Sequence, residues 1–217
     1  MTAVDFILSK ESVLVATDTL ALDENKRPLR FCTKVFPLPH IKCLICGVGS
    51  LQHLLRWFKF VEERCLVDNI TVLNDIAKDI LPKLKLEIEQ EYKAEISSTI
   101  YHFGFNSITN EMEGYALRCN DNYIPQKMGD GIGVRPQEGI IDKINNNEIS
   151  VSNHVELFIE FIKSQKLYDD NLPIAEKVGI GGEIQMFVLQ KEGHYFRTIY
   201  RFEDYDKYYS DMLKCIK

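Results

Sequence analysis

Apolar and polar residues alternate in short blocks near the start of the chain, in a pattern typical of β-hairpins. Apolar segments at 3–9 and 12–18 are separated by the polar pair Lys10 and Glu11, which predicts two antiparallel strands joined by a tight turn. The second segment, SVLVATD, ends on the carboxylate of Asp18. This acid either marks the exit of the strand into solvent or places a charge at the floor of a site.

Three further pairs of apolar segments predict hairpins of the same kind. They are 30–38 with 41–49, turning at Pro39 and His40; 97–106 with 113–120; and the two halves of 181–202, turning at 191–193. The Gly-rich sequence MGDGIGV at 128–134 predicts a bend.

Helical periodicity separates these hairpins. Residues 50–65 carry leucine, phenylalanine and valine at helical spacing, with Ser50 as the expected N-cap. A second apolar stripe runs through 71–96, where Pro82 is expected to kink or divide the helix. Two later segments are also predicted to be helical, 153–167 and 203–217.

This order of elements predicts an α+β fold. Hairpin connections exclude a mainly parallel sheet, and strands in blocks alternating with helices in blocks favour sheets covered by helices. The expected architecture is a four-layer αββα sandwich with two stacked antiparallel sheets. The chain has no internal repeat, low-complexity tract or flexible linker, so residues 1–217 are predicted to form a single domain.

Composition narrows the classes of partner. The 217 residues are 45% hydrophobic and 27% charged, as in soluble globular proteins. The net charge of −6 argues against a nucleic-acid partner, and no apolar run approaches the roughly 18–20 residues that span a bilayer. The N-terminus carries Asp5 and no basic region before its apolar run, so no signal peptide is expected. These features predict a cytoplasmic protein without a membrane partner.

The six cysteines are scattered along the chain, which favours reduced thiols in a cytoplasmic setting. Cys43 and Cys46 have Cys-x-x-Cys spacing, but positions i and i+3 of a strand face opposite ways. The histidines show no metal spacing, and the glycine-rich stretches lack the further residues of nucleotide-binding loops. No metal and no cofactor are therefore predicted.

Four features of the N-terminal half resemble one family. They are Thr2, VLVATDTLA with Asp18, TKVF with Lys34, and CGVGSLQHLL with Gly47. Together they resemble proteasome β subunits and their bacterial ring-protease relatives, members of the N-terminal-nucleophile (Ntn) hydrolase superfamily. Asp18 follows Thr2 by 16 positions and Lys34 follows Asp18 by 16, which is the spacing of nucleophile, acid and lysine in that family.

The resemblance implies a role for each of these residues. Removal of Met1 would expose Thr2 as the nucleophile, with its own α-amine as base. Such an amine has a pKa of about 7.7–8.0, so part of it is neutral at physiological pH. Asp18 would pair with Lys34, whose charge would favour the ionised hydroxyl. Backbone N–H groups at Gly47 would stabilise the oxyanion.

The resemblance also implies substrates and partners. The substrate would be a peptide or a small amide, and the sequence does not separate these two. The chain would form a homo-oligomer, and an unfoldase is among the partners implied.

Four residues, in three parts of the chain, depart from the family pattern. Asp130 stands where the family has a glycine-flanked serine, Leu22 replaces a substrate-contacting threonine, and Lys177 and Ile180 replace an acid and a serine. The departures at Asp130 and Leu22 favour the alternative function, that of a catalytically inactive structural or interaction subunit.

Overall fold

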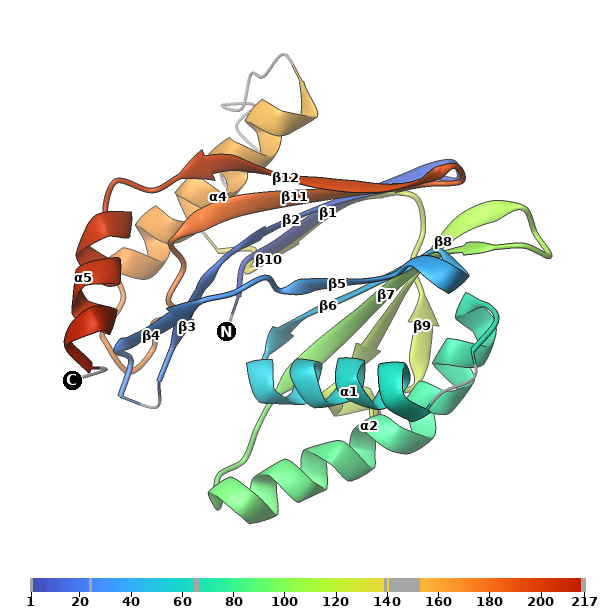
Figure 1. The fold of residues 1–217 in the computed structure, drawn as a ribbon, viewed down its shortest axis with the longest axis horizontal. Helices are drawn as coiled ribbons and strands as arrows, with labels where there is room; N and C mark the ends of the chain where they lie inside the picture. The colour runs from blue at the N-terminus through green and yellow to red at the C-terminus, as the bar shows by residue number, and fades with distance from the viewer. Residues whose placement is uncertain (1, 24, 65–66, 139, 141–152, 216–217) are drawn as a thin grey trace.

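Two antiparallel sheets are stacked face to face with helices on their outer sides (Figure 1). The computed structural model describes residues 2–23, 25–64, 67–138, 140 and 153–215. Among these, the first sheet has the order β10-β1-β2-β11-β12, with bounds Gly131–Arg135, Val4–Leu8, Ser12–Asp18, Glu183–Gln190 and Gly193–Arg201. The second has the order β5-β6-β7-β8-β9, with bounds Val35–Leu38, Cys43–Gly49, Ser98–Asn106, Glu111–Arg118 and Pro125–Lys127.

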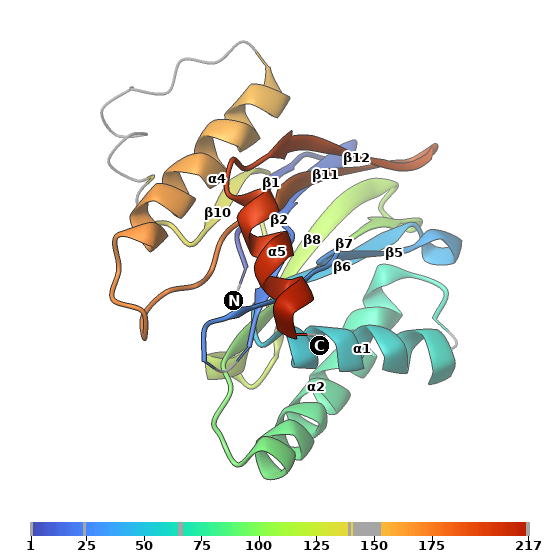
Figure 2. The same cartoon turned by 60° about the vertical axis from the view of Figure 1, so that its left-hand side comes forward.

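Helices form the two outer layers (Figures 1 and 2). Helices α1 (Leu51–Arg64) and α2 (Ile70–Tyr92) cover the second sheet, and α4 (His154–Asp170) covers the first. Helix α5 (Tyr205–Cys215) packs beside a small extra hairpin. The predicted fold class, an α+β four-layer αββα sandwich of the Ntn-hydrolase type, is confirmed.

Strand alternation explains how the layers are held together. Val4, Phe6 and Leu8 of β1 point toward the second sheet and are buried against Phe103 of β7. The intervening residues of β1 face α4. Burying each such large apolar side chain contributes about 1.5–3 kcal/mol, so the two faces of β1 fix its position between the sheets.

Helix starts follow the expected capping chemistry. The hydroxyl oxygen of Ser50 accepts the N–H of His53, as an N-cap does. Asn69 caps α2 in the same manner. Pro82 was expected to kink or divide the second helix; it does not divide it, because α2 continues through Pro82 as one helix. Among the described residues, no helix combines the length and apolarity needed to cross a membrane.

The predicted strand 30–38 is divided in the structure. Residues Pro28–Phe31 form β4, which pairs with β3 (Leu20–Leu22) outside both sheets, and β5 starts only at Val35. The break arises because the chain leaves the first sheet after Asp18, where Leu20 donates its N–H to the carbonyl of Gly181. The departing strand β3 then takes β4 as its hydrogen-bonding partner.

The predicted bend at 128–134 is in large part a strand. Gly131–Arg135 forms β10 and pairs with β1 along its whole length. A Cβ at Gly133 would lie 2.1 Å from the ring of Phe6. The glycine here gives Phe6 room to pack, so composition alone misleads about this segment.

The two cysteines of the CLIC segment face opposite sides of β6. Cys43 packs in the cluster under α1 and α2, whereas Cys46 packs in the core between the sheets. The predicted opposition of their side chains is confirmed.

Two buried histidines link α1 and α2 to the second sheet. Trp57 donates to Nε2 of His102 at 2.9 Å, and Nδ1 of His102 lies 2.8 Å from the side-chain oxygen of Asn74. The first bond requires an unprotonated Nε2, so Nδ1 carries the proton. Burial lowers the pKa of His102 to about 3, and burial is also the main reason that the pKa of His53 is lowered to about 4.

These histidines predict acid sensitivity. Between about pH 6.5 and 4 the histidines are protonated in the unfolded chain but stay neutral in the native protein. The free energy of unfolding therefore falls as the pH falls. Each histidine contributes up to about 1.4 kcal/mol per pH unit. Urea unfolding at a series of pH values between 4.5 and 7 measures this effect. In His102→Gln the free energy of unfolding is expected to change less steeply with pH than in the wild-type protein, by about that amount. An unchanged slope would contradict the prediction.

Candidate functional site

A buried ion pair lies at the end of β2. Nζ of Lys34 donates to Oδ1 of Asp18 at 2.9 Å and to the carbonyl of Leu20 at 2.6 Å. The side chains of Asp18 and Lys34 are 0% and 1% exposed. Asp18 therefore does not mark the exit of the strand into solvent. It occupies an interior position, and its charge is compensated there.

Backbone N–H groups complete the surroundings of Asp18. Ala3 donates to Oδ1 at 3.1 Å, while Leu20 and Gly181 donate to Oδ2 at 3.2 and 3.1 Å. With the lysine, the carboxylate thus has four donors from four separate parts of the chain. A buried charge with this many partners avoids most of the cost of desolvation.

The N-terminal residues lie beside this pair. Val4 of β1 is opposite Thr17 of β2, and the hydrogen bond from Ala3 continues the approach to Asp18. Thr2 is 5% exposed, and the described chain starts between the two sheets (Figure 1). The structure thus brings Asp18, Lys34 and the residue next to Thr2 together, while Met1 lies outside the described residues.

Gly47 lies in strand β6, within the strand predicted over 41–49. It is opposite Ile100 of β7, and a Cβ at this position would lie 2.7 Å from the carbonyl oxygen of Thr99. Close packing of two strands therefore requires glycine. The turn into α1 comes later, at Gly49, whose φ of +91° favours glycine.

Asp130 is distant from Thr2, contrary to the predicted alignment. It is exposed and directly precedes β10, whose first residue, Gly131, is opposite Leu8 at the far end of β1. The residue of β10 that lies opposite Val4, near Thr2, is Arg135. Asp130 therefore does not replace the family's serine, because the antiparallel register places it at the other end of the strand.

Sequence reasoning missed a second buried acid close to this site. Asp5 of β1 is fully buried, and its Oδ1 accepts from the amide of Gln165 at 2.9 Å and from the N–H of Arg135 at 3.2 Å. Among the described residues, neither Oδ2 of Asp5 nor Oε1 of Gln165 has a partner. A proton on Oδ2 would remove the negative charge from this buried carboxyl group.

The environment of Asp5 favours this protonated form. Burial raises the pKa of Asp5 to about 8, and the nearby charge of Asp18 acts in the same direction. The signal in the sequence was an acid inside an apolar strand segment, AVDFILS.

Asp169, at the end of α4, was also missed. It is 2% exposed and accepts the N–H groups of Val178, Gly179 and Ile180 at 2.5, 2.8 and 3.3 Å. It fixes the loop that leads to Gly181, whose N–H binds Asp18. No local pattern marked Asp169, since its partners are backbone groups about ten residues away.

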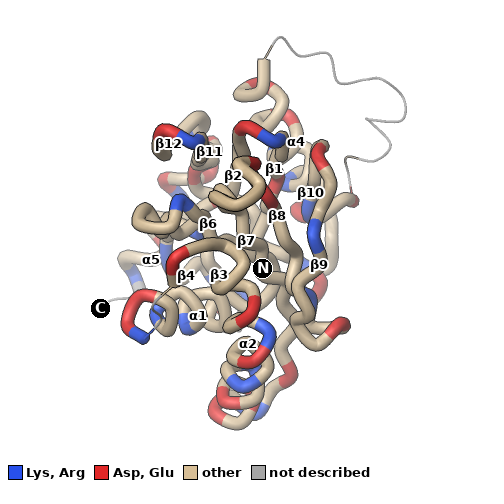
Figure 3. The backbone as a smooth tube through the Cα atoms, turned by 90° about the vertical axis from the view of Figure 1, so that its right-hand side faces the viewer, with Lys and Arg blue, Asp and Glu red and all other residues tan. Residues whose placement is uncertain are grey.

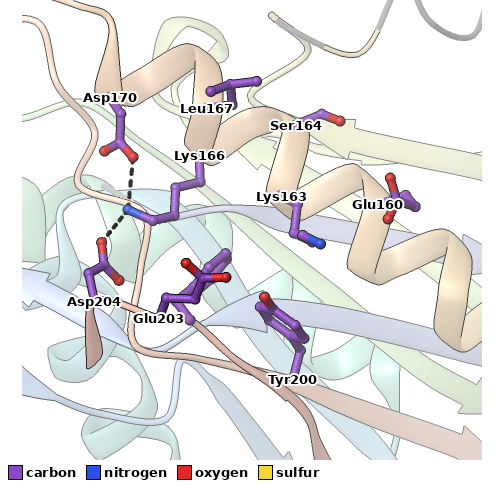
Figure 4. Close-up of a pocket in the computed structure, with 10 residues that line it drawn as sticks. Glu160, Lys163, Ser164, Lys166, Leu167, Asp170, Tyr200, Glu203 and Asp204 are labelled. Carbon is purple, nitrogen blue, oxygen red and sulfur yellow. Dashed lines mark hydrogen bonds and ion pairs between the residues drawn. The ribbon is translucent and has the colours of Figure 1, made fainter. Parts of the chain in front are cut away.

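A separate pocket of about 510 Å³ lies between α4, the end of β12 and the start of α5 (Figure 4). Its lining includes Lys166, which is 9% exposed and forms ion pairs with Asp170 at 3.0 Å and Asp204 at 2.7 Å. The ammonium also lies 5.5 Å from the ring centre of Phe202. This pocket ties α4 to the segment before α5.

Lys166→Met is expected to lower the free energy of unfolding by about 1–3 kcal/mol, because Asp204 loses its cation in a partly buried site. Lys163→Met is the matched control, since Lys163 lines the same pocket but is exposed. Its cost should stay under about 1 kcal/mol. Equal effects of the two substitutions in urea unfolding would contradict this prediction.

Solved structures share this fold. Anbu (ancestral beta-subunit) from Yersinia bercovieri matches with a TM-score of 0.61 and 12% identity, over 99% of this chain and 93% of that chain. An Anbu mutant from Hyphomicrobium sp. strain MC1 matches with a TM-score of 0.63 and 10% identity, over the same shares. No family model matches the chain, and neither does any curated protein.

These findings correct the family resemblance drawn from the motifs. The assignment to proteasome β subunits and bacterial ring-protease subunits is wrong, because the structural neighbours are Anbu proteins. The coarser relationship, a proteasome-like Ntn-hydrolase fold, stands. At 10–12% identity the likeness establishes the fold and assigns no activity.

Proposed function

We propose that this chain is a threonine-type Ntn amidohydrolase that uses Thr2, exposed by removal of Met1, to cleave a peptide or small-amide bond. One observation carries the proposal. The buried Lys34–Asp18 ion pair is hydrogen-bonded, through Asp18, to the N–H of Ala3, the residue that follows Thr2. A fixed positive charge beside an N-terminal hydroxyl is the arrangement that this chemistry requires.

The reaction assigns one task to each group. The free α-amine of Thr2 takes the hydroxyl proton while Oγ1 attacks the carbonyl carbon of the amide. Lys34 stabilises the developing negative charge on Oγ1, and the backbone N–H at Gly47 is the proposed donor to the oxyanion. The C–N bond then breaks, and the protonated amine of Thr2 returns its proton to the leaving nitrogen. Water hydrolyses the resulting ester and restores Thr2.

The proposal extends to assembly and location. The neighbour from Yersinia bercovieri is an ancestral beta-subunit, which supports a homo-oligomeric state for this chain. A cytoplasmic location and an unfoldase partner belong to the same proposal. Native mass spectrometry of the purified protein tests the oligomeric state.

A catalytically inactive subunit is the second candidate function. The observation that favours it is the completeness of the Asp18 cluster, in which one carboxylate binds N–H groups of Ala3, Leu20 and Gly181. Such a cluster fixes the fold and would be needed in a scaffold as well. The two functions therefore differ at Thr2 and not at Asp18.

The state and reactivity of Thr2 separate these functions. Intact-mass analysis is expected to show loss of Met1, and an electrophile directed at N-terminal threonine is expected to label Thr2. Thr2→Ser should keep labelling and hydrolysis of peptide amides, because a hydroxyl remains. Thr2→Val should lose both while retaining the fold, since the side chain keeps its shape. Retained Met1 together with absence of labelling would overturn the proposed hydrolase and favour the inactive subunit.

A further inference from the structure

Two arginines lie at the end of the sandwich where the chain begins. In register, Arg135 of β10 is opposite Val4 of β1, two residues after Thr2. Arg118 ends β8 and is opposite Thr99 of β7, which in turn is opposite Val48, next to Gly47. Each of the two stacked sheets thus contributes one guanidinium at this end; Arg118 and Arg135 are called the arginine pair below.

Strand alternation directs both arginines toward the space between the sheets. Val4 and Tyr101 pack in the inter-sheet core. Partners across an antiparallel pair share a face, as do residues i and i+2 of one strand. Arg135 therefore lies on the face of Val4, and Arg118, the partner of Thr99, lies on the face of Tyr101.

Tyr101 lies on the same inter-sheet face as both arginines. It is opposite Ala116 of β8, two residues before Arg118. Burial raises the pKa of Tyr101, and the positive charges of Arg135 and Arg118 oppose this effect. The Lys34–Asp18 pair at the same end is internally neutral.

No carboxylate compensates the arginine pair among the residues that the structure describes. Arg118 donates to the side-chain oxygen of Gln126, and Arg135 donates to the carbonyl of Val134 at 3.3 Å. Neither forms an ion pair with a described acid, whereas Arg56 and Arg201 each do. Both are half-buried, so they are partly desolvated and still reachable.

A planar guanidinium binds a carboxylate through two parallel hydrogen bonds. Two guanidiniums without an acidic partner among the described residues, at the end of the sandwich where Thr2 lies, have the chemistry to bind one anionic group. Electrostatic attraction is strengthened where water is partly excluded. A neutral substrate would leave these charges without partners.

We propose that the arginine pair selects amide substrates that carry a carboxylate close to the scissile bond. This specificity rests on the proposed function, since the scissile bond is placed by Thr2. The carboxylate comes either from an acidic side chain or from the C-terminus of a short peptide. The two sources share the same chemistry, and the test distinguishes them.

Binding to the full chain carrying Thr2→Val tests the proposal without any requirement for turnover. Calorimetry compares acetyl-Ala-Ala-Glu-Ala-amide, its Gln counterpart, and the Gln peptide with a free C-terminal carboxylate. At least one carboxylate peptide is expected to bind about tenfold more tightly than the neutral one, as for a charge-assisted hydrogen bond. The ratio of the affinities for the carboxylate and neutral peptides should fall close to one when Arg135→Gln or Arg118→Gln is added to Thr2→Val.

A control removes the same charge elsewhere. Arg197→Gln, on the exposed strand β12, should keep the tenfold ratio. Equal affinity for the charged and neutral peptides, absence of binding by all three, or an equal loss in the Arg197 variant would overturn the proposal. A preference for carboxylate peptides without hydrolysis by the wild-type chain would overturn only the proposed hydrolase activity and leave the anion site in place.

Discussion

Lys34→Met is expected to lower the free energy of unfolding by about 3–5 kcal/mol and the rate of amide hydrolysis by about 10²–10³-fold. Stability falls because Asp18 remains fully buried with a charge that has lost its cation. Activity falls because the hydroxyl of Thr2 loses the charge that favours its ionised form. Urea unfolding and peptide-amide hydrolysis measure the two effects separately.

A double substitution separates structure from catalysis in this pair. Asp18→Asn combined with Lys34→Met removes both charges, so it should recover about 2 kcal/mol relative to Lys34→Met alone. Activity should not return, because the lysine is still absent. Lys10→Met is the matched control, since its ion pair with Glu111 is exposed and worth under about 1 kcal/mol. Return of activity in the double variant would contradict the role proposed for Lys34.

Asp5→Asn is expected to stabilise the protein at neutral pH. Burial raises the pKa of Asp5 from 3.8 to about 8, so between these values the native state holds a proton that the unfolded chain releases. Stability therefore falls as pH rises from about 4 to 8, by up to about 1.4 kcal/mol per pH unit. Asparagine is neutral at every pH, so the variant never carries the buried charge that Asp5 acquires above its pKa.

The expected gain is on the order of 2–4 kcal/mol at pH 7, and it should shrink toward zero near pH 4. Urea unfolding of both proteins across pH 4–9 measures it. Asp130→Asn is the control, because Asp130 is exposed at the other end of β1, and it should leave the profile unchanged. A gain for Asp5→Asn that does not vary with pH would contradict protonation of Asp5 as its cause.

Opposing charge effects predict where the protein is most stable. Loss of stability below about pH 6.5 comes from His53 and His102, whose pKa values are lowered by burial. Asp5 acts in the opposite direction from about pH 4 to 8; below about pH 6.5 the two histidines outweigh it, and above that pH it acts without them. These groups together place the maximum near pH 6–6.5.

Local pattern was sufficient for most of the elements. Hydrophobic periodicity and turn residues predicted the outer helices and three hairpins, β1 with β2, β7 with β8 and β11 with β12. Figure 3 shows acidic and basic residues interspersed along these elements. Such signals lie within a few residues of one another. The family resemblance drawn from the motifs around Asp18 and Lys34 also implied a pair that the structure brings to 2.9 Å.

The sequence by itself thus determined the layer order and the buried ion pair. Only the tertiary structure decided the register of β10, which removes Asp130 from the site and brings Arg135 to it. That register depends on Gly133 meeting the ring of Phe6, a contact between residues more than a hundred positions apart. The burial of Asp5, which raises its pKa, and the placement of Arg118 and Arg135 at one end of the two sheets were likewise decided there. Desolvation and the sum of nearby charges depend on every element packed around a group, and no local pattern encodes them.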